Sequence, residues 1–125
     1  MRILVAEDDP GNQELMVEAL ELLGHQAEVA SNGLDVVKLA HQEVYGLIFM
    51  DCGLPFLSGV DAVSRLRASG AQCQSAGVPI IALTGDVSRS KRDECLESGM
   101  NDVLTKPVSL EDLERVIHRW EGEVA

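Results

Sequence analysis

The sequence is poor in aromatic residues and has no long apolar stretch. Only 3% of its 125 residues are aromatic, so aliphatic side chains supply most of its 46% hydrophobic content. No apolar run approaches the roughly 20 residues that a membrane-spanning helix needs. The run after Met1 and Arg2 reaches acidic residues too early for a signal peptide. We therefore expect one cytoplasmic globular domain over residues 1–125, without membrane contact.

Basic residues and cysteines are also scarce. The chain has 10 Lys and Arg against 21 Asp and Glu, and its formal net charge of -11 opposes binding to the phosphates of nucleic acid. The cysteines Cys52, Cys73 and Cys95 are odd in number and show no Cys-x-x-Cys spacing. These features disfavour direct nucleic-acid binding, a disulfide framework and a zinc site.

Two of the apolar runs that are present end directly in acidic residues. The run at residues 3–6 precedes the acidic segment 7–9, and the run at residues 47–50 precedes Asp51. Runs this short and apolar are typical of strands buried on both faces, and in an open parallel sheet the ligand crevice lies beyond the carboxyl ends of the strands. Because carboxylates gathered there repel one another, we expect either a raised carboxylate pKa or a hard cation held by oxygen ligands.

Strand and helix patterns alternate along the whole chain. The apolar runs predict strands at residues 3–6, 26–30, 47–50, 78–83 and 102–105. Helical spacing and capping residues predict helices before Gly24, after Ser31-Asn32, after Gly59, from about Ser88 to Ser98, and from a capping box at Ser109. Three solid runs and two alternating ones favour an α/β fold, a flavodoxin-like doubly wound sheet of five parallel strands in order 2-1-3-4-5 with five helices. The small, polar segment 68–77 is expected to be a flexible connection.

In this fold, five polar side chains converge at the carboxyl edge of the sheet. Asp8 and Asp51, with a backbone carbonyl, are candidate ligands of Mg²⁺, which prefers octahedral oxygen coordination, and Glu7 is expected to act through water. The Thr84 hydroxyl and the Lys106 ammonium complete an anion site. The chemistry that such a site favours is attack by an Asp51 oxygen on a phosphoryl group whose charge the cations stabilise.

These residues resemble the motifs of response-regulator receiver domains of two-component signalling, over essentially the whole chain. The pair at residues 7–8 resembles the acidic pair of that family, and Asp51 resembles its phosphoacceptor. Thr84 resembles its switch hydroxyl, and Lys106-Pro107 its lysine followed by a cis peptide bond. Four motifs in register make the resemblance specific, because any one of them alone is common by chance.

Segments 7–13 and 99–102 are most similar to receivers of hybrid histidine kinases. The resemblance implies that Asp51 accepts a phosphoryl group from the phosphohistidine of a histidine kinase transmitter or a histidine phosphotransfer domain. It also implies Mg²⁺ as the cofactor and a phosphorylation-dependent change in protein–protein contacts. Such a domain catalyses only its own phosphorylation and dephosphorylation, and a homodimer is left open.

The resemblance implies roles for four further positions. The Gly53 carbonyl would be the third protein ligand of Mg²⁺, and Asp9, at a place often held by asparagine, would act from outside the direct ligands. Variation at Gly53 and Asp86 is associated in the family with the lifetime of the aspartyl phosphate. Val103 stands where the family usually has Tyr or Phe, so signalling by the Thr84 shift is expected to depend on backbone movement of the loop after the fourth strand.

Three other functions are weighed against the receiver. A phosphatase of the haloacid dehalogenase type uses similar groups, but it needs Asp-x-Asp after the first strand and room for a substrate cap, whereas segment 7–9 reads Glu-Asp-Asp. A flavodoxin-like nucleotide carrier needs a neutral or glycine-rich phosphate loop, which the same acids preclude. A degenerate receiver that acts only as an interaction module is left open by Val103 and disfavoured by the intact acidic site.

Overall fold

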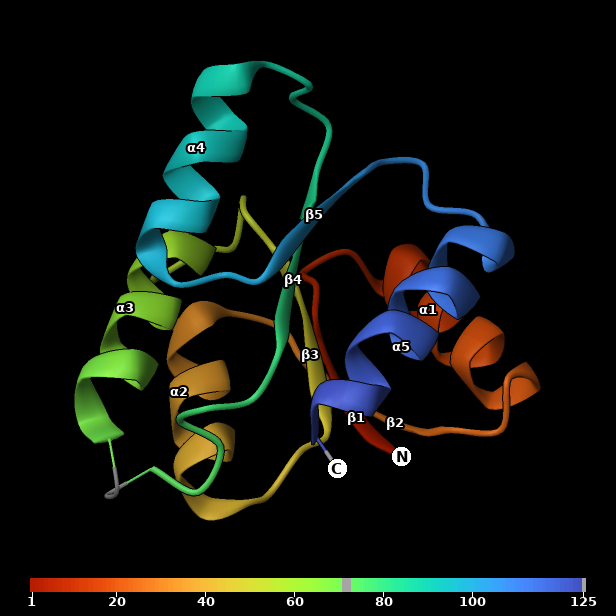
Figure 1. Cartoon of the computed structure of the whole chain (residues 1–125), viewed down its shortest axis with the longest axis horizontal. Helices are drawn as coiled ribbons and strands as arrows, with labels where there is room; N and C mark the ends of the chain where they lie inside the picture. The colour runs from red at the N-terminus through yellow and green to blue at the C-terminus, as the bar shows by residue number, and fades with distance from the viewer. Residues whose placement is uncertain (71–72, 125) are drawn as a thin grey trace.

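The computed structural model describes residues 1–70 and 73–124, and it has the predicted α/β fold (Figure 1). Five parallel strands form one sheet in the order β2-β1-β3-β4-β5. The five helices connect and follow these strands. Along the chain the elements are β1 (Arg2–Ala6), α1 (Pro10–Leu22), β2 (Gln26–Ala30), α2 (Gly33–Gln42), β3 (Leu47–Asp51), α3 (Gly59–Ser69), β4 (Ile80–Thr84), α4 (Arg89–Ser98), β5 (Asp102–Thr105) and α5 (Leu110–Val124).

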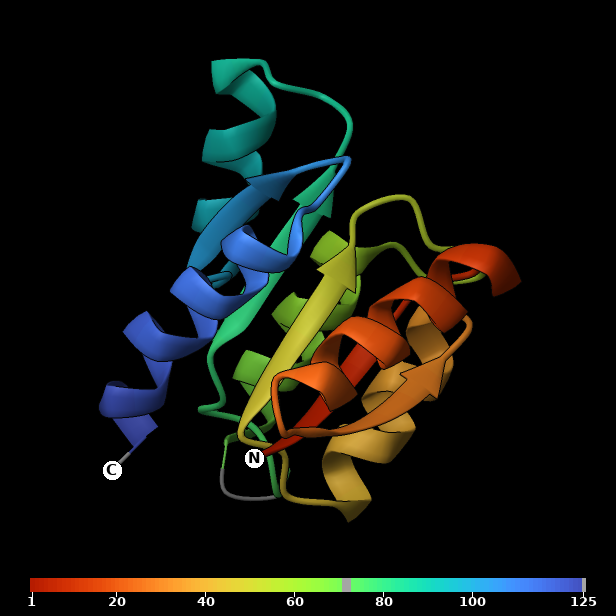
Figure 2. The same cartoon turned by 90° about the vertical axis from the view of Figure 1, so that its right-hand side faces the viewer.

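The helices form two layers, one on each face of the sheet. α2, α3 and α4 cover one face, and α1 and α5 cover the other, which is turned toward the viewer in Figure 2. Because successive strand residues point to opposite faces, β1 sends Leu4 to the first layer and Ile3 to the second. β3 divides in the same way, with Ile48 on one side and Phe49 on the other. The central strands therefore need side chains that are apolar at nearly every position.

Local signals in the sequence set the ends of several helices. Asn32 and Ser88 accept hydrogen bonds from backbone amides in the first turns of α2 and α4, and Gly99 ends α4 in the left-handed conformation with φ 115°. Before α5, the Ser109 hydroxyl accepts from the Asp112 amide while the Asp112 carboxylate accepts from the Ser109 amide. These predicted ends are confirmed. None of the helices in the described part of the chain combines the length and apolar character needed to cross a bilayer.

The predicted flexible connection at residues 68–77 is wrong for the part that the structure describes. Its first residues belong to α3, and Ser75 is buried. The Ser75 hydroxyl donates to the Glu43 carbonyl at 2.6 Å and accepts from the Tyr45 amide at 2.9 Å. Small polar composition misled the prediction, because it does not distinguish a solvated segment from one that satisfies backbone groups of a neighbouring loop. Residues 71–72 lie outside the described part.

We expect Gly59→Ala to destabilise the domain by about 2 kcal/mol, within the usual cost of overpacking. A Cβ atom at Gly59 would lie 2.6 Å from the Asp51 carbonyl oxygen and 3.0 Å from Cγ of Met50, so α3 would have to move away from the end of β3. Urea unfolding measures the change. Gly77→Ala is the control, because a Cβ atom there meets nothing within 4 Å and should change stability by less than about 0.5 kcal/mol. Equal effects of the two substitutions would contradict this steric account.

Candidate functional site

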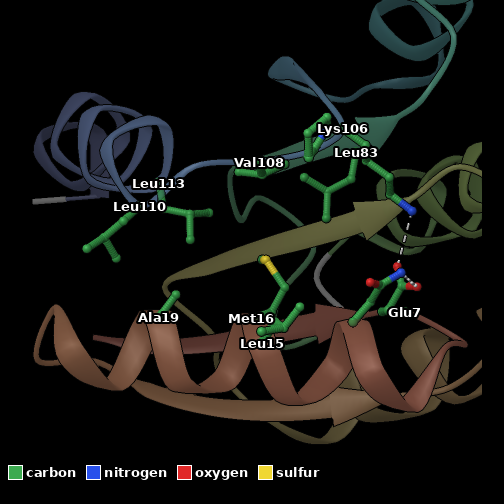
Figure 3. A pocket seen from close by; sticks show the side chains of 11 residues that line it. Glu7, Leu15, Met16, Ala19, Leu83, Lys106, Val108, Leu110 and Leu113 are labelled. Atoms are coloured by element: carbon green, nitrogen blue, oxygen red, sulfur yellow. Dashed lines mark hydrogen bonds and ion pairs between the residues drawn. The ribbon is translucent and has the colours of Figure 1, made fainter.

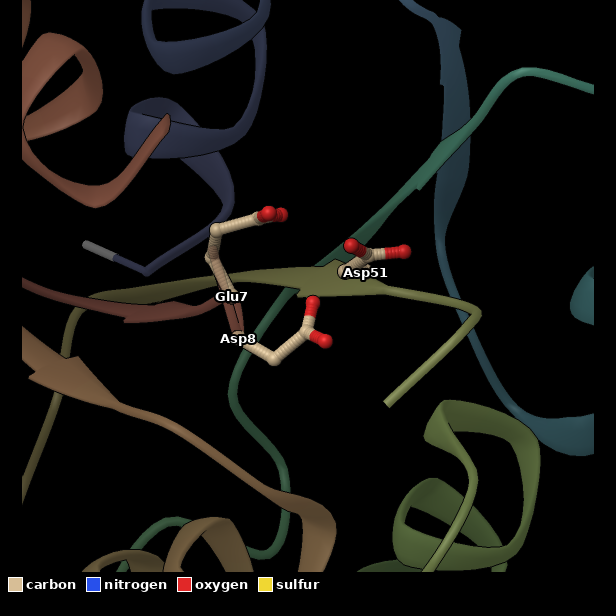
Figure 4. Close-up of side chains that lie close together, drawn as sticks. All are labelled: Glu7, Asp8 and Asp51. Carbon is tan, nitrogen blue, oxygen red and sulfur yellow. The ribbon is translucent and has the colours of Figure 1, made fainter. Parts of the chain in front are cut away.

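Three carboxylates meet at the carboxyl edge of the sheet, as predicted. β1 pairs with β3, so the residues after β1 lie beside the end of β3. Figure 4 shows Glu7, Asp8 and Asp51 converging from these two strands, and one carboxylate oxygen of each lies within 4.8 Å of the others. Glu7 is only 2% exposed and Asp51 8%, whereas Asp8 is exposed. Two of the three negative charges are therefore largely shielded from water.

Lys106 supplies the positive charge nearest to these acids. Its Nζ lies 2.8 Å from Oδ2 of Asp51 and 3.4 Å from Oε2 of Glu7. Its backbone amide donates to the Thr84 carbonyl at 2.8 Å, which anchors the start of the loop after β5 to the end of β4. The Lys106-Pro107 peptide bond is cis, as the resemblance implies.

The pKa values of Glu7 and Asp51, the two shielded acids, are shifted in opposite directions. Burial raises the pKa of Glu7, and the neighbouring Asp51 carboxylate raises it further. Burial also acts to raise the pKa of Asp51, but hydrogen bonds from Glu7, Lys106 and the Gly53 amide outweigh it, so the pKa of Asp51 is lowered. Without a metal, a proton shared by the pair therefore resides on Glu7, and Asp51 is the carboxylate.

Side chains from the first turn of α1 fix the position of Glu7. Asn12 donates from Nδ2 to Oε1 of Glu7 at 3.1 Å, and Gln13 donates from Nε2 to the Glu7 carbonyl at 2.6 Å. Gln13 also donates to the Ser31 hydroxyl after β2. The sequence prediction assigned no role to these two amides, although their place in the first turn after the acids was a signal that they face the site.

Asp9 does not belong to the group of converging carboxylates. Its side chain caps α1 by accepting from the Asn12 amide at 2.8 Å, and only its backbone amide reaches Glu7, at 3.3 Å from Oε1. In this structure Asp9 therefore holds the α1 terminus beside the site, and the role that the resemblance implies for it stays a prediction.

The hydroxyl of Thr84 is engaged within the loop after β4. Thr84 is buried at the end of β4, and its Oγ1 accepts from the Asp86 amide at 3.0 Å. The exposed Asp86 in turn accepts from the Ser88 amide at 2.8 Å, which lowers the pKa of Asp86. The two predicted residues thus form a chain of hydrogen bonds that leads from the sheet to α4.

Gly53 contacts Asp51, whereas Val103 belongs to the core. The Gly53 amide donates to Oδ1 of Asp51 at 2.9 Å, so the turn after β3 orients the acid. Val103, in β5, pairs with Ala82 in β4. It is half-buried against the core beneath α2, α3 and α4. Its side chain fills part of that core.

Cys52 is next to Asp51 but is not part of the acidic group. It packs against α4, with its Sγ 3.4 Å from Sγ of Cys95. Burial raises the pKa of Cys52 to about 12, so its thiol is neutral at pH 7. The alternation of side chains along the strand separates this sulfur from the carboxylates.

An apolar pocket of about 420 Å³ opens beside the acids (Figure 3). It lies between α1 and α5, and its walls include Leu15 and Met16 from α1 and Leu110 from α5. Glu7 and Lys106 line its end nearest the site. Leu15 is 66% exposed, so this face offers apolar area directly next to the charged groups.

The donor set fits a hard divalent cation. Three carboxylates face one ammonium group, and Lys106 can compensate only part of their charge. All of the side-chain ligands are oxygens, and no cysteine or histidine joins the group. Oxygen-only sites with excess negative charge favour Mg²⁺ or Ca²⁺ over transition metals.

The sheet order and the acidic edge together define a doubly wound α/β domain with an acidic site at the carboxyl ends of β1 and β3. The family model described as the response regulator receiver domain matches residues 3–118. The chain therefore belongs to the response regulator receiver domain family, as the sequence predicts.

Three relatives show how close the similarity is. The receiver domain of sensor histidine kinase PA1611 from Pseudomonas aeruginosa PAO1, solved with a magnesium ion coordinated in the active site cleft, is 39% identical with a TM-score of 0.88, over 97% of each chain. The receiver domain of Ssk1 from Saccharomyces cerevisiae, solved with the histidine phosphotransfer signaling protein Ypd1, is 34% identical with a TM-score of 0.90, over 98% of this chain and 89% of that one. The sensor protein GacS of Pseudomonas syringae is 34% identical over 121 residues, which are 97% of this chain and 13% of GacS. The chain thus spans a small part of that curated relative.

We expect Glu7→Gln to raise the stability of the metal-free domain at pH 7 by about 1 kcal/mol, or about 4 °C in Tm. The pKa of Glu7 is raised in the folded state, so the stability linked to its protonation is present below the ordinary pKa of a glutamate and lost as pH rises through the raised value. Glutamine keeps the neutral form at every pH. Thermal unfolding in EDTA at pH 7 and pH 4 measures the difference.

The advantage of Glu7→Gln should shrink toward pH 4, where the wild-type acid is protonated. Glu14→Gln is the matched control, because Glu14 is exposed on α1 and should change Tm little at either pH. A Glu7→Gln variant that is less stable than wild type at pH 7 would contradict the assignment of the proton to Glu7.

Proposed function

We propose that residues 1–125 form one phosphorelay receiver domain, in which Asp51 accepts a phosphoryl group from a phosphohistidine in the presence of Mg²⁺. The observation that carries this proposal is the position of the Lys106 ammonium, 2.8 Å from Asp51 within a group of three carboxylates. A structural ion pair needs one acid. Two further acids, Glu7 and Asp8, give the site the excess negative charge that binds a cation, and the cation then allows a phosphoryl group to bind.

Each side chain has a part in the transfer. Asp8, Asp51 and the Gly53 carbonyl would hold Mg²⁺, and Glu7 would act through water. The bound cation supplies charge neutralisation for the incoming phosphoryl oxygens. Asp51 remains ionised because of its lowered pKa, and one of its oxygens attacks phosphorus while the bond from phosphorus to the histidine nitrogen breaks. Lys106 then stabilises a phosphoryl oxygen, and Thr84 exchanges its bond with the Asp86 amide for one with the phosphoryl group.

The partner in this proposal is a histidine kinase transmitter or a histidine phosphotransfer domain. The complex of the Ssk1 receiver with Ypd1 supports a phosphotransfer partner, and the similarity to GacS supports a place within a sensor kinase. The apolar pocket between α1 and α5 offers such a partner a contact surface beside Asp51. The net charge of -11 supports protein partners over nucleic acid, and the domain acts in the cytoplasm without membrane contact. In this role the domain turns over no external substrate.

Acetyl phosphate with Mg²⁺ should add a single base-labile phosphoryl group to the protein, as measured by intact mass. EDTA should abolish the adduct, because the excess negative charge then repels the donor. Asp51→Asn should remove the adduct, and Asp93→Asn, on the exposed face of α4, should retain it. Steady hydrolysis of many phosphomonoesters, with no adduct on Asp51, would instead support the phosphatase alternative.

Beryllofluoride with Mg²⁺ should shift the backbone amide resonances of the loop at residues 85–88 and of α4. Val103 has too little side-chain area to cover or uncover a pocket as an aromatic ring does, so the loop that Thr84 holds must carry the change. Two-dimensional NMR spectra measure these shifts, and amides in α2 serve as an internal reference. Silence across α4 and β5 would contradict a conventional output switch and favour a receiver that reports its state in another way.

A further inference from the structure

Two of the three free cysteines lie in direct contact beneath the phosphoacceptor. Sγ of Cys52 is 3.4 Å from Sγ of Cys95, and both residues are buried. Cys52 immediately follows Asp51 at the end of β3, whereas Cys95 belongs to α4. The contact therefore joins the end of β3, which carries the proposed phosphoacceptor Asp51, to the helix that follows the Thr84 loop.

Cys95 is also the residue through which α4 enters the core. It is the one residue of α4 that is buried, whereas α2 has three buried residues and α3 has four. Most other α4 side chains are exposed and polar or charged. α4 is therefore held to the sheet through a thiol, and its position is more easily changed than that of its neighbours.

We propose that Cys52 and Cys95 form an oxidisable pair, which a peroxide converts into a disulfide that ties α4 to the end of β3. One thiol sulfur attacks a peroxide oxygen and breaks the O–O bond, and the thiol proton passes to the leaving hydroxide, which gives a sulfenic acid and, from hydrogen peroxide, water. The second sulfur attacks the sulfenic sulfur, an S–S bond forms, the S–O bond breaks, and a second water leaves. Two thiols and one peroxide thus give one disulfide and two waters.

The geometry suits a bond between Cys52 and Cys95. A disulfide needs its sulfurs about 2.05 Å apart, so the two atoms must approach by little more than 1 Å. The weak attachment of α4 allows that movement, and it also admits the oxidant when the helix lifts away. Cys73 is engaged elsewhere, where its thiol donates to the Ala40 carbonyl at 3.3 Å.

The bond would restrain the segment that the proposed switch must move. The loop at residues 85–88 separates Thr84 from α4, and the hydrogen bonds of Asp86 and Ser88 connect the two. A covalent link from Cys95 to Cys52 fixes the helix relative to Asp51. Formation of the bond does not depend on phosphorylation, so the two properties can be tested separately.

Hydrogen peroxide treatment followed by alkylation and mass mapping tests the pair on wild-type protein and on Cys73→Ala. We expect two thiols to be lost in both proteins, an intramolecular cross-link between the peptides of Cys52 and Cys95, and reversal by dithiothreitol. Cys73 should stay alkylatable in wild type after denaturation. Cys95→Ala should give no cross-link. The test holds even if that variant does not fold, because wild type and Cys73→Ala by themselves identify which two cysteines are joined.

Amide hydrogen exchange tests the restraint on α4. In the oxidised Cys73→Ala protein, α4 amides should exchange at least about tenfold more slowly than in the reduced protein, while α2 amides stay unchanged. Sulfinic acids without a cross-link, a bond to Cys73, or only intermolecular disulfides would overturn the pairing. A Cys52–Cys95 cross-link that leaves α4 exchange unchanged would overturn the restraint.

Discussion

The repulsion among Glu7, Asp8 and Asp51 is the constraint on which the site depends. Left alone, three carboxylates this close would separate or take up protons. One ammonium group, at 2.8 Å from Asp51, offsets part of the charge, and burial raises the pKa of Glu7. The remaining negative charge favours binding of a cation, and in the proposed function the cation in turn makes the approach of a phosphoryl group favourable.

The apolar core holds these acids together against their repulsion. β1 and β3 are buried on both faces, so a slip in register by one residue would move every side chain to the opposite face. The cost of such a slip is the burial of two strands, which greatly exceeds what separating the carboxylates would gain. The short apolar runs and the acidic residues that follow them are therefore two parts of one arrangement.

Much of this arrangement could be predicted from the sequence, because it follows from periodicity and topology. Short apolar runs that end in acids, read in a parallel sheet, place Asp8 beside Asp51, and the later strands add Thr84 and Lys106. What could not be predicted depends on side-chain geometry within loops. The burial of Ser75 is one case, and the bond between the Thr84 hydroxyl and the Asp86 amide is another. Hydrogen bonds of this kind produce no periodic pattern of residues in the sequence.

In the proposed function, the bond from the Asp86 amide to Thr84 makes the resting loop a competitor of the phosphoryl group for one hydroxyl. Whatever stabilises that bond lowers the affinity of the site for its modified state, and whatever breaks it raises that affinity. Because such coupling is reciprocal, a protein that binds only the released loop must favour the phosphorylated form by the same factor by which phosphorylation favours its binding. The lifetime of the signal is then set jointly by the domain and by the partner that reads it.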